Sequence, residues 1–169
     1  MGQVTPPDFS QFKLRVNIKT AIENAYKAWA TPSGLESWFV RKAIFTDEKG
    51  VARAGDELIK GNDEYLFLFH SYPDSMEVKG SVLKTNDKNL FSFTFSKKCP
   101  VSISIYPEQG QTIVELFESN LTTDDETFRK TYVSDSKGWI FYLSNLKSIL
   151  EGGIDLRNKD EAIKGVITA

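Results

Sequence analysis

The chain has 169 residues, of which 40% are hydrophobic and 12% aromatic, enough to bury one sizeable core. Its 21 basic and 23 acidic residues are spread along the sequence and leave a formal charge of −2, which disfavours nucleic acid as a partner. The single cysteine, Cys99, excludes an internal disulfide framework, so we expect a cytoplasmic protein. No apolar run reaches the length of a membrane span, so we expect no membrane insertion.

The N-terminal part predicts one strand followed by two short helices. Apolar and polar residues alternate strictly over residues 12–19, which is typical of a strand with one buried face. Apolar residues then recur at helical spacing, at Ile22, Ala25, Tyr26 and Trp29. Thr31 is a predicted N-cap, with Pro32 at the first position of a second helix that carries Leu35, Trp38 and Phe39.

The middle of the chain predicts an antiparallel meander. From residue 42 onward, short runs with β-like composition are separated by turn residues, and the main runs are 65–70, 76–83, 90–96, 101–106 and 112–119. Their connections leave no space for crossover helices. Residues 65–69 break the alternation, which suggests a strand covered on both faces.

The C-terminal part predicts a long helix. Thr122 with Asp125, and Thr123 with Glu126, have the spacing of a helix start. One apolar stripe follows, and Gly152-Gly153 ends it; the stripe is Trp139, Tyr142, Leu143, Leu146, Ile149 and Leu150. We therefore predict a single α+β domain over residues 1–169, with its core at about 10–152 and an extension at 153–169.

Few residues carry recognisable chemistry. His70 is the sole histidine and has no accompanying nucleophile or metal motif, so we interpret it as an ordinary strand residue. Glu115 and Glu118 lie three apart on one predicted strand, so their side chains should point to opposite faces. One of them could be a lone interior base, although solvent exposure or a cross-strand ion pair is the favoured interpretation. The sequence assigns no catalytic residue, metal ligand or cofactor.

The order of predicted elements, with Ala28-Trp29-Ala30-Thr31-Pro32 and Trp38-Phe39, resembles the START-like (SRPBCC) helix-grip superfamily. Residues 138–151, GWIFYLSNLKSILE, are similar to the signature of its branch named after the activator of the Hsp90 ATPase (homologue 1-like proteins), and residues 153–157 resemble the tail of small bacterial members. The resemblance implies a curved antiparallel sheet that grips the long helix, with a cavity that in relatives holds lipids, sterols, polyketides or other hydrophobic molecules.

Three functions remain open at this point. The leading one is binding of a hydrophobic or amphipathic small molecule between the long helix and the sheet. Its candidate lining residues are Trp29, Trp38, Phe39, Phe67, Phe93, Ile103, Trp139, Tyr142 and Leu146. The second is a cyclase, dehydratase or hydrolase that uses one buried acid or Tyr. The third is a protein-interaction module, such as a chaperone regulator, for which Phe141 is the candidate surface residue because it falls outside the helical stripe. The alternative for Phe141 is packing on the chain between Thr131 and Asp135.

Overall fold

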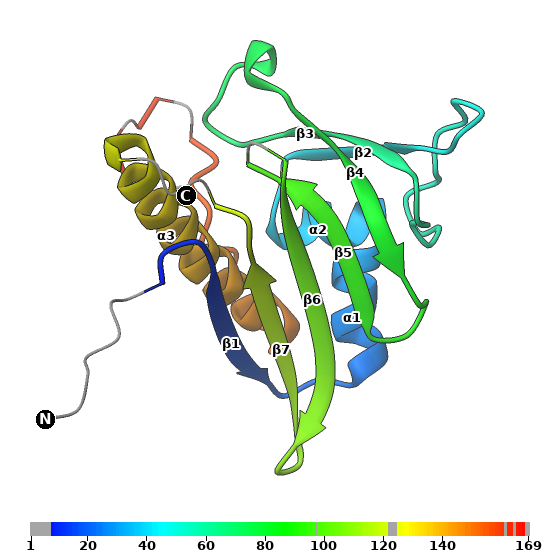
Figure 1. Ribbon diagram of the computed structural model, residues 1–169. Coiled ribbons are helices and arrows are strands. Elements are labelled where there is room, and N and C mark those ends of the chain that lie inside the picture. The colour runs from blue at the N-terminus through cyan, green and yellow to red at the C-terminus, as the bar shows by residue number, and fades with distance from the viewer. Residues whose placement is uncertain (1–7, 97, 122–124, 161, 164, 168–169) are drawn as a thin grey trace, which may run out of the picture.

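The computed structural model describes residues 8–96, 98–121, 125–160, 162–163 and 165–167 (Figure 1). Seven strands and three α-helices make up this part of the chain, with one short 3-10 helix, η1. In chain order they are β1 (Phe12–Ile18), α1 (Ile22–Ala30), α2 (Pro32–Trp38), β2 (Lys42–Thr46), β3 (Glu64–Leu68), η1 (Asp74–Met76), β4 (Val78–Thr85), β5 (Leu90–Phe95), β6 (Cys99–Glu108), β7 (Gln111–Glu118) and α3 (Asp125–Leu150).

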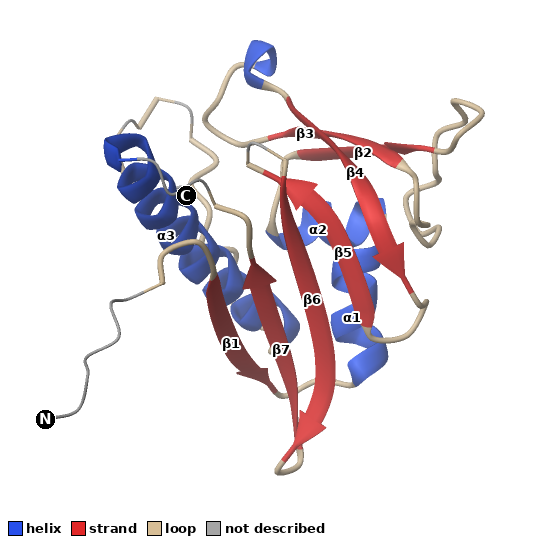
Figure 2. Ribbon diagram, viewed as in Figure 1, coloured by secondary structure: helices blue, strands red, loops and turns tan. Residues whose placement is uncertain are grey.

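The strands form one antiparallel sheet in the order β1-β7-β6-β5-β4-β3-β2. The helices α1, α2 and α3 pack on the same side of this curved sheet (Figure 2). This confirms the predicted helix-grip arrangement of an α+β domain. On β3, however, Leu66 and Leu68 are only half-buried, so the prediction of a strand covered on both faces is wrong.

The turn between α1 and α2 is built as the sequence predicts. The Thr31 hydroxyl accepts a hydrogen bond from the Gly34 amide at 3.0 Å, which caps α2, and Pro32 follows at the first helical position. A Cβ atom on Gly34 would lie 2.2 Å from the Lys27 carbonyl oxygen. Glycine therefore allows the two short helices to approach closely.

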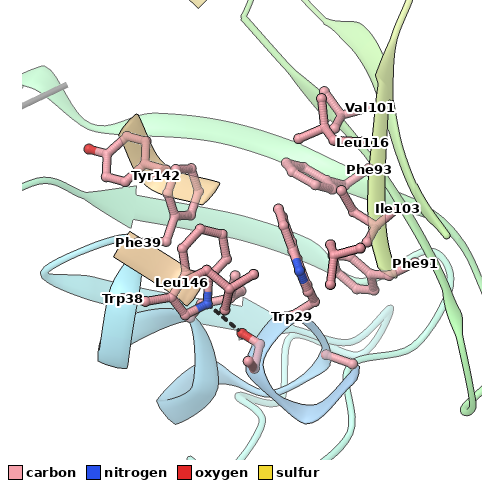
Figure 3. Packing of buried hydrophobic residues seen from close by; sticks show 14 of the residues in the cluster. Trp29, Trp38, Phe39, Phe91, Phe93, Val101, Ile103, Leu116, Tyr142 and Leu146 are labelled. Atoms are coloured by element: carbon pink, nitrogen blue, oxygen red, sulfur yellow. Dashed lines mark hydrogen bonds between the residues drawn. The ribbon is translucent and has the colours of Figure 1, made fainter. Parts of the chain in front are cut away.

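Aromatic rings fill the centre of the core (Figure 3). Trp29 and Trp38 meet edge to face with ring centroids 4.6 Å apart, and both are fully buried. The Trp38 indole also donates a hydrogen bond of 2.9 Å to the Ala28 carbonyl oxygen. This bond satisfies the polar atom of a ring that no water reaches.

The chain after α3 is tied back to α2. Gly152, with φ of 79°, ends the helix as predicted. Arg157 is buried, and its guanidinium donates hydrogen bonds to the carbonyl oxygens of Glu36, Ser37 and Val40 at 2.8–3.1 Å. The residues 153–157 thus cap the C-terminal end of α2. The predicted caps at the start of α3 involve Thr122 and Thr123, which lie outside the described residues.

Candidate ligand-binding site

A pocket of about 250 Å³ lies between α3, the end of β5 and the connection from β3 to β4. Six of its eleven lining residues are aromatic. The lining consists of Phe39, Phe69, Tyr72, Met76, Val78, Phe95, Ser134, Asp135, Gly138, Trp139 and Tyr142. Tyr72 and Met76, which belong to the β3–β4 connection, are 41% and 56% exposed and form the outer rim.

The floor of the pocket is a packed set of rings. Phe39 stacks on Trp139 with centroids 5.2 Å apart and meets Tyr142 edge to face at 4.7 Å. Phe95 lies 5.1 Å from Trp139 on the sheet side. Because each ring is held by its neighbours, the floor should keep its shape whether or not a ligand is present.

Gly138 leaves part of the pocket open. It lies in α3 and belongs to the lining, and a Cβ atom added there would meet nothing within 4 Å. A glycine inside a helix costs about 1 kcal/mol relative to alanine. Here the missing side chain exposes space beside Trp139.

Nine residues were predicted to line a cavity, and the structure divides them into two groups. Phe39, Trp139 and Tyr142 do line the pocket. The others pack in the core away from it, with side chains that are at most 1% exposed; they are Trp29, Trp38, Phe67, Phe93, Ile103 and Leu146. Trp29, Trp38, Phe93, Ile103 and Leu146 are labelled in Figure 3 within the close-packed cluster.

Glu118 is the most unusual polar residue of the core. It is the last residue of β7 and is fully buried, although a glutamate is rarely found without access to water. Its Oε2 atom accepts a hydrogen bond of 2.8 Å from the Trp139 indole. Its Oε1 atom accepts no hydrogen bond from the described donor groups. The favoured expectation of a solvated or ion-paired Glu118 is therefore wrong.

Asp135 lies next to Glu118 and lines the pocket. Burial, followed by the negative charge of Asp135, raises the pKa of Glu118 to about 8, while the hydrogen bond from Trp139 opposes this change. A hydrogen bond between the carboxyl groups of Glu118 and Asp135 requires that one of them holds a proton. At neutral pH the Glu118–Asp135 pair thus keeps one proton beside the pocket.

Sequence reasoning did not select Asp135, although a signal for it exists. Asp135 precedes Trp139 by four residues and Tyr142 by seven, so it falls on the apolar stripe of α3. An acidic residue on such a stripe must either be paired or face a cavity.

The other titratable residues that the sequence singled out lie elsewhere. Glu115 forms ion pairs with Lys13 at 3.1 Å and Arg15 at 3.6 Å, which agrees with the cross-strand interpretation. His70 is half-buried and does not line the pocket. Burial, and then the charge of Arg157, lowers the pKa of His70, so the ring is neutral at pH 7.

The surface candidate Phe141 is half-buried and packs against the core, with its ring 5.5 Å from that of Tyr142. Among the described side chains of α3, the exposed large apolar ones are instead Val133 and Ile140, at 50% and 53%. Among the described residues, no group of three His, Cys, Asp or Glu side chains could hold a metal ion, and no helix is both long and apolar enough to cross a bilayer.

Comparisons with known proteins relate the chain to others through its structure. No protein-family model matches it, and no curated protein matches its sequence. Among solved structures, a protein from Staphylococcus saprophyticus superposes with a TM-score of 0.68 at 19% identity, covering 87% of this chain and 96% of the other. The chain has the helix-grip fold.

Two further solved structures support this fold. The Aha1 dimer from Colwellia psychrerythraea has a TM-score of 0.63 at 19% identity, over 85% of this chain and 97% of that one. A Bacillus halodurans protein has a TM-score of 0.61 at 18% identity, over 83% and 96% of the two chains. At these identities the similarity concerns the helix-grip fold alone.

Proposed function

We propose that this domain binds a small apolar or amphipathic molecule, one end of which enters the pocket beside α3. The observation that supports the proposal is the aromatic lining around a space that Gly138 leaves open. Protein pockets for drug-sized ligands usually have volumes of roughly 300–1,000 Å³. A pocket of about 250 Å³ fits a compact molecule or the end of a longer one that passes the rim at Tyr72 and Met76.

The helix-grip fold is consistent with this proposal because its relatives include carriers of hydrophobic molecules, as the sequence resemblance implies. Burying an apolar ligand would gain roughly 25 cal/mol for each Å² of apolar surface removed from water. The ring floor at Phe39 and Trp139 is already ordered, so little conformational entropy is lost when a ligand binds.

The test is to close the pocket with one substitution. In Gly138→Leu the added Cβ atom would meet nothing within 4 Å, and helix propensity improves, so the variant should fold with the longer side chain directed at the pocket that Gly138 lines. We expect the wild-type protein to bind N-phenyl-1-naphthylamine, a neutral dye that fluoresces in apolar surroundings, and Gly138→Leu to bind it at least tenfold more weakly. Lys137→Leu is the matched control, because Lys137 is exposed and outside the lining.

Equal dye affinity in Gly138→Leu and wild type would refute the proposed pocket. Native mass spectrometry of freshly purified protein gives an independent test, since a retained ligand would add a defined mass. Saturating ligand at about one hundred times its Kd should stabilise the native state by about 2.7 kcal/mol.

An enzyme is the second candidate, and the burial of Glu118 favours it. A carboxyl group with a pKa of about 8 can act as a general acid at neutral pH. Glu118 lies behind Trp139 and is not part of the lining, so Asp135 would have to pass the proton to a substrate. Turnover that survives Asp135→Asn would exclude this route.

A further inference from the structure

The Glu118–Asp135 pair gives the pocket a definite charge preference. Among its described lining residues, Asp135 carries the only carboxyl group, and no Lys, Arg or His is present. Glu118 adds a second carboxyl group directly behind the wall, where it is 0% exposed and where its Oε1 atom accepts no hydrogen bond from the described donors. A ligand with a negative charge would therefore be repelled from this end of the pocket.

The aromatic rings of the lining also favour a positively charged ligand. The faces of aromatic rings carry negative electrostatic potential and attract cations that approach within about 6 Å of the ring centre. Trp139 and Tyr142 lie four and seven residues after Asp135 in α3, so the carboxyl group and the two rings share one side of the helix. An ammonium group placed there would contact both kinds of partner.

From these contacts we infer that the ligand of this pocket carries a positively charged amine or quaternary ammonium group at its buried end, held by Asp135 and the surrounding rings. The inference rests on the proposed binding function and adds the chemical class of the ligand. Glu118 does not touch the ligand. It acts as a positioning residue, because its protonation state sets the total charge of the Glu118–Asp135 pair that faces the ligand.

Proton linkage follows from the arrangement. Among the described side chains of α3, the titratable group that faces Glu118 is Asp135, and the cross-strand neighbours of Glu118 on β1 and β6 are Phe12 and Val101, which do not titrate. A bound cation favours the pair without its proton, so binding at neutral pH should release that proton. The affinity for a cation should consequently increase with pH toward about 8, by at most about tenfold per pH unit.

The test uses two probes that differ only in charge. Benzyltrimethylammonium is permanently cationic, and neopentylbenzene has the same shape with carbon in place of nitrogen. Titrations below the solubility limits, followed by the fluorescence of the tryptophans, should show at least tenfold tighter binding of the cation at pH 8.5. The preference should shrink several-fold at pH 6.5.

Three variants separate the roles of the carboxyl groups. Asp135→Asn should reduce cation affinity about tenfold and leave neopentylbenzene unaffected. Glu118→Gln should keep cation binding but remove its pH dependence between 6.5 and 8.5. Glu115→Gln is the control, because it removes a carboxylate from the same strand that is paired with Lys13 rather than facing the pocket.

The outcomes distinguish this inference from the proposed function. If both probes bind equally, or neopentylbenzene binds more tightly, the charge preference is refuted while the apolar pocket stands. If cation binding is unchanged in Asp135→Asn, the assigned contact is refuted. If neither probe binds and Gly138→Leu leaves dye binding unchanged, both the inference and the proposed function fail.

Discussion

Replacing Glu118 by glutamine should stabilise the protein at neutral and alkaline pH. The folded state raises the pKa of this carboxyl from 4.5 to about 8, so the folded protein binds one proton more than the unfolded chain between these values. The free energy of unfolding must then fall as the pH rises, by about 1.4 kcal/mol per pH unit. Between pH 4.5 and pH 8 the free energy of unfolding therefore falls by roughly 5 kcal/mol, of which about 3 kcal/mol is already lost at pH 7.

The Gln variant avoids this loss because it never ionises. Its amide oxygen can accept the hydrogen bond from Trp139, and its amide nitrogen can donate to Asp135, so both contacts of the pair are kept. We expect the difference in stability between Glu118→Gln and wild type to be small at pH 5 and to grow steadily up to pH 8. Burial lowers the pKa of His70 as well, but this residue is common to both proteins and its contribution cancels in the difference.

Urea denaturation at half-unit steps from pH 5 to pH 8.5, followed by circular dichroism, measures this difference. Glu115→Gln is the matched control: burial opposes ionisation of Glu115, but Lys13 and Tyr106 hold its pKa below the usual value, so its effect should be constant above pH 5. Parallel stability curves for wild type and Glu118→Gln would show that Glu118 is ionised in the folded state. The reasoning about the Glu118–Asp135 pair would then be wrong.

Three other predictions concern residues that stabilise the fold outside the pocket. Arg157→Ala should lower the free energy of unfolding by about 3 kcal/mol or more, because buried carbonyl groups and Asp155 lose their partner; thermal melting would detect this, and an unchanged melting temperature would contradict it. Burial opposes ionisation of Asp155, but hydrogen bonds from Arg157 and Lys159 hold its pKa below the usual value. The stability gap between wild type and Asp155→Asn should therefore close as the pH falls below about 4, whereas a constant gap in acid denaturation would argue against this ion pair. Gly80→Ala should destabilise the sheet, because its Cβ atom would lie 2.5 Å from the Tyr65 hydroxyl, and a melting temperature equal to that of wild type would contradict this steric argument.

Sequence periodicity was sufficient to predict most of the fold. The alternation over residues 12–19 and the Thr31-Pro32 start of α2 correspond closely to the structure. The helical stripe from Trp139 onward, together with the helix start predicted from the Thr122–Asp125 and Thr123–Glu126 spacings, identified α3, which begins at Asp125.

The candidate site was harder to predict for two different reasons. With Val114 and Leu116 on the inner face of β7, alternation places Glu118 there as well, but the usual exposure of glutamate argued against that position. The lining residues could not be distinguished from the core residues by sequence. A tryptophan such as Trp29 occurs at the same helical spacing whether its ring fills the core or lines a pocket. Only the packing of α3 against β7 brings Asp135 to Glu118.

The hydrogen bonds around Phe39 connect the end of the chain to the pocket floor. The carbonyl group before this ring accepts a hydrogen bond from Asn145 at 2.7 Å, and the one after it, on Val40, accepts from Arg157 at 2.9 Å. Residues far along the sequence therefore fix the backbone on both sides of a ring that a ligand would touch. Shortening the protein before Arg157 should therefore loosen that ring, so substitutions in the tail can change the shape of the pocket as well as substitutions in its lining.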